Sequence, residues 1–133
     1  MTEANGGIRR LEIGDVVSAL FPVHRPGGHE QAGYRPAVVV GVPERLGTPR
    51  FGSLLLAPMT SDRGQDWAER SPALYPRYAA GTAGLRSPSI CLLDQTRALE
   101  SERVNRYRGT LDAGQYQPIH TGLSKMLSYD TEM

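Results

Sequence analysis

The chain has 133 residues, a length that fits one domain with a hydrophobic core of its own. Its 15 basic and 14 acidic residues give a net charge of +1, which excludes a general attraction to nucleic acid; such binding must come from arginines placed locally. The single cysteine, Cys91, excludes an internal disulfide, and its apolar surroundings predict a buried, unreactive thiol. Neither a membrane-spanning run nor a signal peptide is visible, so we expect a cytoplasmic protein.

We expect one domain over residues 12–133, preceded by a flexible polar tail over residues 1–11. In the first half of the domain, apolar runs rich in β-branched residues, separated by proline and glycine, predict short strands. These strands cover residues 13–21, 36–42 and 51–57. Because proline lacks a backbone donor, we expect Pro58 to end the third strand and a long polar loop to continue to Ser71.

In the second half, we expect strands over residues 73–78, 89–93 and 107–111, and one helical turn over residues 99–104. Pro76 restricts the first of these strands to a sheet edge or a bulge. A C-terminal helix follows Asp112, whose carboxylate can cap it, and apolar residues recur there at helical spacing. Pro118 lies inside that pattern, so the helix either begins near Gln115 or is kinked. Short strands and one late helix predict a mainly β fold, a small and strongly curved antiparallel barrel.

Residues 28–40 combine a loop of reactive side chains with a buried strand. The loop contains glycines and places an imidazole, a carboxylate, an amide and a guanidinium close together in sequence: His29, Glu30, Gln31 and Arg35. Pro36 favours an extended backbone at Arg35, so this arginine stands where the loop becomes a strand. A charged group at the mouth of a strand is held by a rigid element and still faces solvent, as reactive groups commonly do.

Four segments follow one another in a recognisable order: GDVV at residues 14–17, the loop and strand at 28–40, APMTS at 57–61, and SICLLDQTRAL at 89–99. Together they resemble the MazF/PemK family of toxin endoribonucleases, over about residues 14 to 127. The resemblance implies the SH3-like barrel that this family shares with the gyrase poison CcdB, whereas composition alone does not separate that barrel from an OB-fold. It also implies a homodimer and a small antitoxin partner.

RNA carries its own nucleophile, the 2′-hydroxyl, so an enzyme can cleave it without a metal ion. The site then needs a proton acceptor, a proton donor, and hydrogen-bond donors for the oxygens of the phosphorane. His24 and His29 share one loop and His120 is far away in sequence, so the histidines predict no metal site. We therefore expect no cofactor.

Three residues are candidates for catalysis. Arg35 can bind two phosphate oxygens with its guanidinium fork, or it can be a surface arginine paired with Glu30 or Asp94. Thr60 follows a proline at the expected strand end, where its hydroxyl can donate to the same phosphate or simply form a turn. Glu30 is a candidate base for the 2′-hydroxyl, or a carboxylate that orders the loop. The resemblance implies that Arg35 and Thr60 are the catalytic pair.

Seven further residues are candidates for substrate binding: His29, Gln31, Tyr34, Ser61, Trp67, Gln95 and Arg97. An imidazole suits acid–base chemistry, but the histidine of some family members matches Tyr34 and not His29, which leaves a histidine acid in doubt. Gln31 is better suited to ordering the loop than to contacting a base. Trp67 can stack on a base or pin the long loop to the barrel, and Arg97 can position a phosphate or pair with a carboxylate.

With the resemblance, these residues predict the toxin of a type II toxin–antitoxin system, a metal-independent and sequence-selective endoribonuclease acting on single-stranded RNA. The family's products have a 2′,3′-cyclic phosphate and a 5′-hydroxyl. Two alternatives stay open, because a fold does not fix a function. One is a gyrase-directed poison of the CcdB type, which would not need the set of Glu30, Arg35 and Thr60. The other is a catalytically inactive binding module on the same barrel.

Overall fold

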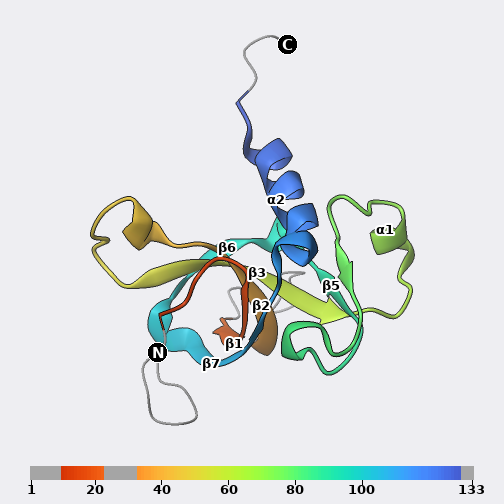
Figure 1. Cartoon of the computed structure of the whole chain (residues 1–133), viewed down its shortest axis with the longest axis horizontal. Helices are drawn as coiled ribbons and strands as arrows, with labels where there is room; N and C mark the ends of the chain where they lie inside the picture. Colours follow the sequence, from red (N-terminus) through yellow and green to blue (C-terminus); the bar gives the residue numbers. More distant parts are fainter. Residues whose placement is uncertain (1–9, 23–32, 130–133) are drawn as a thin grey trace.

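The computed structural model describes residues 10–22 and 33–129 of the chain. The strands in this part are β1 (Asp15–Phe21), β2 (Gly33–Gly41), β3 (Ser53–Ser61), β4 (Arg77–Tyr78), β5 (Ser89–Cys91), β6 (Arg97–Glu100) and β7 (Val104–Thr110). The helices are α1 (Asp66–Glu69) and α2 (Ala113–Leu127). Figure 1 shows the strands curling around a common centre, with α2 rising from them. The predicted mainly β fold with a C-terminal helix is confirmed, and its curvature is compatible with a small barrel.

All strand pairs in the described sheet are antiparallel, and the strand order is β4-β5-β3-β2-β1-β7, with β6 also paired to β3. One edge of β3 pairs with β2. Its other edge pairs first with β6, from Ser53 to Leu56, and then with β5, from Met59 to Ser61. The long strand β3 therefore connects two parts of the sheet and holds the residues at its end in place.

The structure shows that the prediction for Pro58 was wrong, because this proline lies inside β3, opposite Ala37. It stands where β3 changes its partner from β6 to β5, a place where a missing ladder donor costs little. Its carbonyl still accepts a hydrogen bond from the Leu92 amide at 2.9 Å. Thr60 consequently lies on a strand and not in a loop, so its position is fixed by strand pairing.

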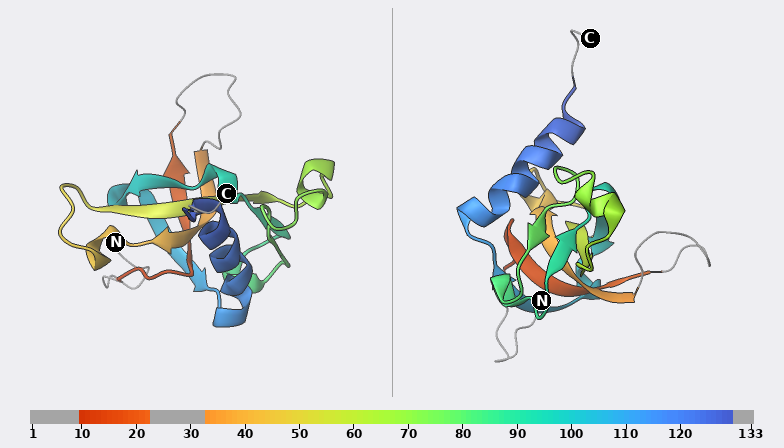
Figure 2. Two further views of the ribbon diagram at one scale, coloured as in Figure 1. Left: turned by 90° about the horizontal axis from the view of Figure 1, so that it is seen from above. Right: turned by 90° about the vertical axis from the view of Figure 1, so that its right-hand side faces the viewer.

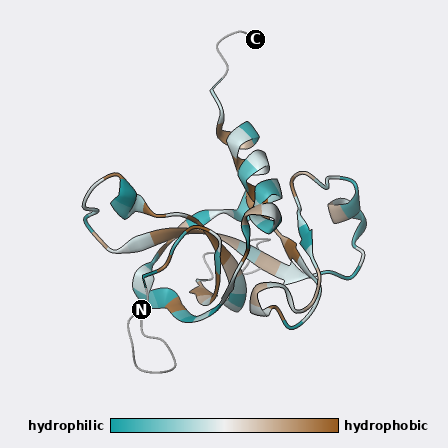
Figure 3. Ribbon diagram, in the orientation of Figure 1, coloured by the Kyte–Doolittle hydropathy of each residue, from teal (hydrophilic) through white to brown (hydrophobic). Residues whose placement is uncertain are grey.

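Alternate residues of β2 enter two different hydrophobic clusters, because successive side chains of a strand point to opposite faces. Ala37 and Val39 belong to the first cluster, with Leu56 of β3, and Val38 belongs to the second, with Ile119 of α2. In Figure 2, α2 lies outside the strands, so it covers the outer face. Figure 3 shows hydrophobic segments along the central strands. Burial on both faces explains the unbroken run of valines in this strand.

Two residues mark the limits of the core. Cys91 is buried in the second cluster, and burial raises the pKa of its thiol to about 12, which confirms the predicted unreactive cysteine.

Leu11 is buried in the first cluster, although the sequence placed it at the end of a flexible tail. Packing therefore begins before the predicted boundary at residue 12, while residues 1–9 of that tail lie outside the described part.

The helix α2 begins at Ala113, ahead of Gln115, and continues through Pro118. Its start is fixed by a capping box: Asp112 Oδ1 accepts from the Gln115 amide at 2.8 Å, and Gln115 Oε1 accepts from the Asp112 amide at 2.9 Å. The Tyr78 hydroxyl also donates to the Gln115 carbonyl at 2.7 Å. Of the two alternatives from the sequence, a helix that starts only near Gln115 is wrong, because the cap at Asp112 acts three residues earlier.

Three other elements differ from their predicted bounds. The expected strand over residues 73–78 is reduced to β4, because the Leu74 and Tyr75 amides donate to the Ser71 carbonyl in a turn. The expected helical turn over residues 99–104 contains the end of β6 and a 3-10 turn, Ser101–Arg103. The last strand, β7, begins at Val104, three positions before its predicted start. Within the described residues, no helix has the length and apolar character to cross a membrane.

Replacing Asp112 with alanine should lower the free energy of unfolding by about 1 kcal/mol, because it removes the carboxylate that accepts the hydrogen bond from the Gln115 amide. Urea unfolding measures the change. Asp112→Asn keeps a side-chain oxygen for the Gln115 amide and should recover most of the loss. Equal stability of the wild type and the alanine variant would contradict a role for this cap.

Candidate active site at the ends of β2 and β3

Arg35 and Thr60 lie at the same level on neighbouring antiparallel strands. The pairing of β2 with β3 joins Val39 with Leu56, Val38 with Ala57 and Ala37 with Pro58, and ends there. Continuing the same register by two residues places Arg35 opposite Thr60. Level residues of an antiparallel pair project to the same face, with their Cβ atoms about 4.5–5.5 Å apart in a regular ladder. The guanidinium and the hydroxyl therefore leave the sheet on one face, which is the face of the first core cluster.

Strand pairing on both outer sides holds these two residues. Arg35 is level with Ala19 of β1, and Thr60 is level with Ile90 of β5. Ala19 and Ile90 are fully buried, whereas Arg35 and Thr60 are only half-buried. Reactive groups at these positions would combine a rigid backbone with access to solvent, which suits precise placement on a ligand.

Three predicted site residues, Glu30, His29 and Gln31, lie outside the described residues. Their roles stay predictions from the sequence. The described neighbours of that segment are β1, which ends at Phe21, and β2, which begins at Gly33. Phe21 and Gly33 are level in the sheet.

Tyr34 and Ser61 form a second level pair, which projects from the opposite face to Arg35 and Thr60. Continuing the same register by one more step makes them level with each other. Both are exposed, Tyr34 to 67% of its surface. Tyr34 and Arg35 are neighbours in the sequence, but the alternation of the strand points their side chains to opposite faces. Tyr34 and Ser61 can therefore contact only a ligand that lies against the outer face of the sheet.

Arg97 shares the face of Thr60 but lies further along β3. Leu56 of β3 pairs with Val39 on one side and with Arg97 of β6 on the other. The four residue-to-residue steps from Leu56 to Thr60 span about 13 Å of strand. Gln95 belongs to the 3-10 turn Leu93–Gln95 that leads into β6, and it is half-buried. Arg97 is thus placed to contact a neighbouring part of a ligand that Thr60 binds.

Trp67 lies in α1 and packs edge-on against Tyr75, with ring centroids 4.9 Å apart and an interplanar angle of 79°. The next residue, Ala68, is buried with Ile90 and Leu92. The contact attaches the 62–71 segment to the rest of the protein, as one of the two interpretations of Trp67 predicts. The ring is nevertheless 42% exposed, which leaves surface for stacking.

Polar contacts hold the same segment. Arg77 lies 3.4 Å from an Asp62 carboxylate oxygen and 4.0 Å from one of Glu69. The Tyr75 hydroxyl donates to Asp94 at 2.7 Å, and this hydrogen bond, with burial, raises the pKa of Tyr75 to about 12. Asp94 therefore has a tyrosine partner that the sequence analysis did not foresee.

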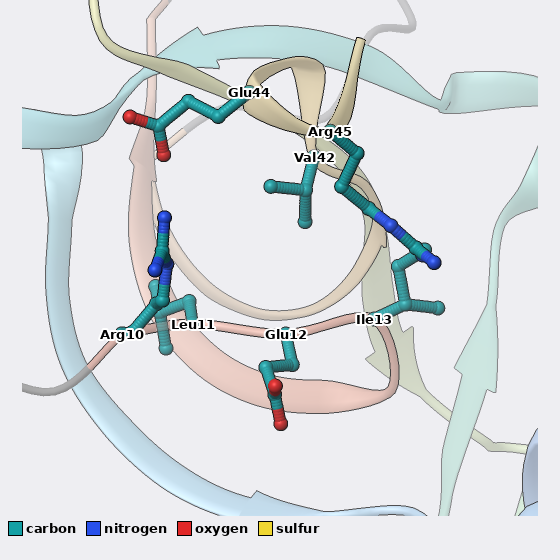
Figure 4. Close-up of a pocket in the computed structure, with 7 residues that line it drawn as sticks. All are labelled: Arg10, Leu11, Glu12, Ile13, Val42, Glu44 and Arg45. Carbon is teal, nitrogen blue, oxygen red and sulfur yellow. The ribbon is translucent and has the colours of Figure 1, made fainter.

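A cavity of about 520 Å³ lies at the other end of β2 (Figure 4). It is lined by Arg10, Leu11, Glu12, Ile13, Val42, Glu44 and Arg45. Val42 and Arg35 are seven residues apart along an extended chain, roughly 23 Å. The cavity is therefore separate from the candidate active site. In the described part of the chain, no three His, Cys, Asp or Glu residues gather as metal ligands would.

The arrangement of Arg35 and Thr60 is suited to binding an anion. Arginine offers two parallel donors and a fixed positive charge, and the threonine hydroxyl adds a third donor on the same face. Donors held rigidly around a phosphate stabilise the extra negative charge that develops when the phosphate is attacked.

Two arginines of β7, Arg106 and Arg108, were not among the binding candidates chosen from the sequence. Their two-residue spacing within a strand predicts that they share a face.

Comparisons with solved structures show a shared fold. The toxin MazF-mt6 of Mycobacterium tuberculosis is 19% identical, with 87% of this chain and 98% of that chain covered and a TM-score of 0.60. MazF of Deinococcus radiodurans is 24% identical, with 88% and 96% covered and a TM-score of 0.64. An endoribonuclease from a mycobacterial species, solved with its cognate antitoxin, is 14% identical, with 88% and 94% covered and a TM-score of 0.55.

The family assignment comes from the sequence as a whole. No curated protein matches the chain significantly. The model of the PemK-like, MazF-like toxins of type II toxin–antitoxin systems matches residues 12–127, which include β1 to α2 and both Arg35 and Thr60. The chain therefore belongs to the PemK-like, MazF-like toxin family.

Proposed function

We propose that this protein is the toxin of a type II toxin–antitoxin system and an endoribonuclease that cleaves single-stranded RNA at selected sequences. The observation that carries the proposal is the level placement of Arg35 and Thr60 on one face of the sheet. Membership of the toxin family supports it. The cytoplasm, where RNA is available, is the proposed site of action.

The proposed reaction uses the RNA's own 2′-hydroxyl. Its oxygen attacks the adjacent phosphorus, the bond from phosphorus to the 5′-oxygen breaks, and a 2′,3′-cyclic phosphate forms. The proton of the 2′-hydroxyl passes to a base, for which Glu30 is the candidate, and the leaving oxygen takes up a proton to become a 5′-hydroxyl. Arg35 and Thr60 donate hydrogen bonds to the phosphate oxygens, whose negative charge grows in the transition state.

The remaining candidates would hold the rest of the substrate. Arg97, on the face of Thr60, is proposed to contact a neighbouring phosphate, and Gln95 lies in the turn that leads into the same strand. The exposed part of Trp67 is available to stack on a base. Tyr34 and Ser61 would contact RNA that passes over the opposite face. His29 and Gln31 are proposed to shape the loop before β2.

Incubation with RNA of mixed sequence in the presence of EDTA tests this proposal. We expect cleavage at specific sites, with a cyclic phosphate at one new end and a hydroxyl at the other. An oligonucleotide with a 2′-deoxy residue at the cleavage site should stay intact, because its nucleophile is missing. Intact RNA, or products with a 3′-hydroxyl, would contradict the proposed reaction.

An antitoxin partner and a homodimer complete the proposal. The similar structures include a MazE–MazF pair from Deinococcus radiodurans, in addition to the mycobacterial complex. Growth arrest on expression should be relieved by co-expression of the cognate antitoxin. Sedimentation equilibrium should give twice the mass of the 14.5 kDa chain. A stable monomer would remove the dimer from the proposal and leave the nuclease activity to be judged by its own test.

A further inference from the structure

Three arginines gather on the outer side of β7 and the turn beside it. Arg106 and Arg108 lie two residues apart in β7, and Arg86 follows the 3-10 turn Thr82–Gly84. The Arg108 guanidinium donates to the carbonyl of Gly84, two residues before Arg86, and the charges of Arg106 and Arg86 repel it. We call Arg86, Arg106 and Arg108 the arginine cluster.

The backbone of the 82–84 turn is packed directly against β7, and this packing fixes the cluster. A side chain on Gly109 would bring a Cβ to 2.5 Å from the Ala83 carbonyl carbon, and one on Gly84 would overlap the Arg108 carbonyl oxygen. Gly84 has φ +78°, a conformation that suits glycine. Contact this close leaves the backbone of the turn little freedom, and Arg86 follows this turn by two residues.

Arg108 is partly buried, and its hydrogen bonds in the described part of the chain go to uncharged groups. Its Nη1 donates to the Ser18 hydroxyl at 2.8 Å and its Nη2 to the Gly84 carbonyl at 3.3 Å. Its Nε is buried and has no acceptor among residues 10–22 and 33–129. Burial and then the repulsion from its two neighbours lower the pKa of this guanidinium.

Within residues 10–22 and 33–129, none of the three arginines forms an ion pair with a carboxylate. By contrast, Arg77 in the same part of the chain has two carboxylate neighbours. Neighbouring guanidinium groups that have no carboxylate partner among the described residues favour an anion that accepts several hydrogen bonds, and phosphate is such an anion.

The cluster is near the candidate active site but does not face it. Ser18 of β1 is level with Pro36 of β2 and with Arg106 of β7, so two strand spacings, about 10 Å, separate β2 from β7. Ser18 and Pro36 project from the face opposite to Ala19 and Arg35. A phosphate bound by the cluster is therefore a different phosphate from the one that Arg35 and Thr60 are proposed to hold.

We propose that the arginine cluster binds a backbone phosphate of the RNA outside the scissile bond. This inference rests on the proposed function for the identity of the ligand. The cluster contacts only the phosphate and therefore adds affinity without selecting a sequence. RNA that continues past the cleavage site along the outer face would also pass Tyr34, which is exposed on the face of Ser18.

The test is binding of a long single-stranded RNA whose cleavage site carries a 2′-deoxy residue, measured over a range of salt concentrations. The double variant Arg86→Gln/Arg106→Gln should bind about tenfold more weakly than the wild type. Its plot of log affinity against log salt should be shallower by about 0.7, the value for one phosphate contact with a single strand. Both residues are exposed, so an unchanged melting temperature is expected and confirms folding.

The variant Arg45→Gln is the matched control, since it removes one exposed arginine at the far end of β2. It should keep the wild-type affinity and slope. An unchanged affinity and slope in the double variant would overturn the inference. Binding of polyglutamate is measured in parallel. A double variant that no longer binds polyglutamate but still binds RNA like the wild type would also overturn the inference and would indicate an acidic protein partner. Wild-type protein that binds RNA but never cleaves it would instead overturn the proposed function and leave the phosphate site standing.

Discussion

Replacing Arg35 with alanine is expected to slow RNA cleavage by about 10²–10³-fold, the usual cost of removing one positioned donor from an oxyanion site. The residue is half-buried near the start of β2 and level with Thr60. Its charge is proposed to act on the phosphorane more strongly than on the ground-state phosphate. The rate constant under single-turnover conditions with saturating enzyme is the quantity to measure, because it separates chemistry from binding.

Two other variants sharpen this result. Arg35→Lys keeps the charge but loses the fork, so it should recover only part of the rate. Arg45→Ala removes an exposed arginine away from the site and should cleave as the wild type does. A folded Arg35→Ala protein with full activity would remove Arg35 from the reaction. Growth arrest that survives this substitution would favour a poison of the CcdB type, which does not depend on the chemistry of a phosphate.

The same experiment can ask whether Arg35 and Thr60 act on one phosphate. Thr60→Val removes the hydroxyl and keeps the shape of the side chain. If both groups bind the same phosphate, the double variant should be less impaired than the product of the two single effects, because each loss disturbs the ligand that the other holds. Independent effects would place the two side chains on different parts of the substrate.

The fold was largely predictable from local patterns. Strands such as β2 carry β-branched residues without polar interruption, because both of their faces are covered. The cap at Asp112 also predicted the start of α2 correctly, since a capping box needs only residues three positions apart. These signals are local, so they are present in the sequence before any tertiary contact is known.

The remaining features depend on contacts between distant segments. Pro58 continues β3 because β5 and β6 both pair with that strand, which no local rule for proline anticipates. Tyr34 and Arg35 are adjacent in the sequence, and their separation onto opposite faces follows only once the strand is known to begin at Gly33. The arginine cluster needs the close packing of Gly84 on β7, which brings Arg86 beside residues 20 positions away.

The largest stability effect is expected at Asp15, the acidic residue of the GDVV segment. Asp15 is only 1% exposed, and its two carboxylate oxygens accept hydrogen bonds at 2.8 Å from the Glu12 amide and from the Thr110 hydroxyl. The Tyr107 hydroxyl lies 2.6 Å from the same Thr110 oxygen. The carboxylate therefore ties the start of β1 to the end of β7, the two strands that support the arginine cluster.

Asp15→Ala should lower the free energy of unfolding by about 2–4 kcal/mol, since it removes a buried charged acceptor from the Glu12 amide and the Thr110 hydroxyl. Urea unfolding should show a lower midpoint with an unchanged slope. Thr110→Val removes the hydrogen bond from the Thr110 hydroxyl and keeps the one from the Glu12 amide, so it should cost less, about 1–2 kcal/mol. Glu102→Ala removes an exposed carboxylate and should leave the midpoint within error. If Asp15→Ala were as stable as Glu102→Ala, the buried carboxylate would hold no strands together, and its retention would require a role in the activity itself.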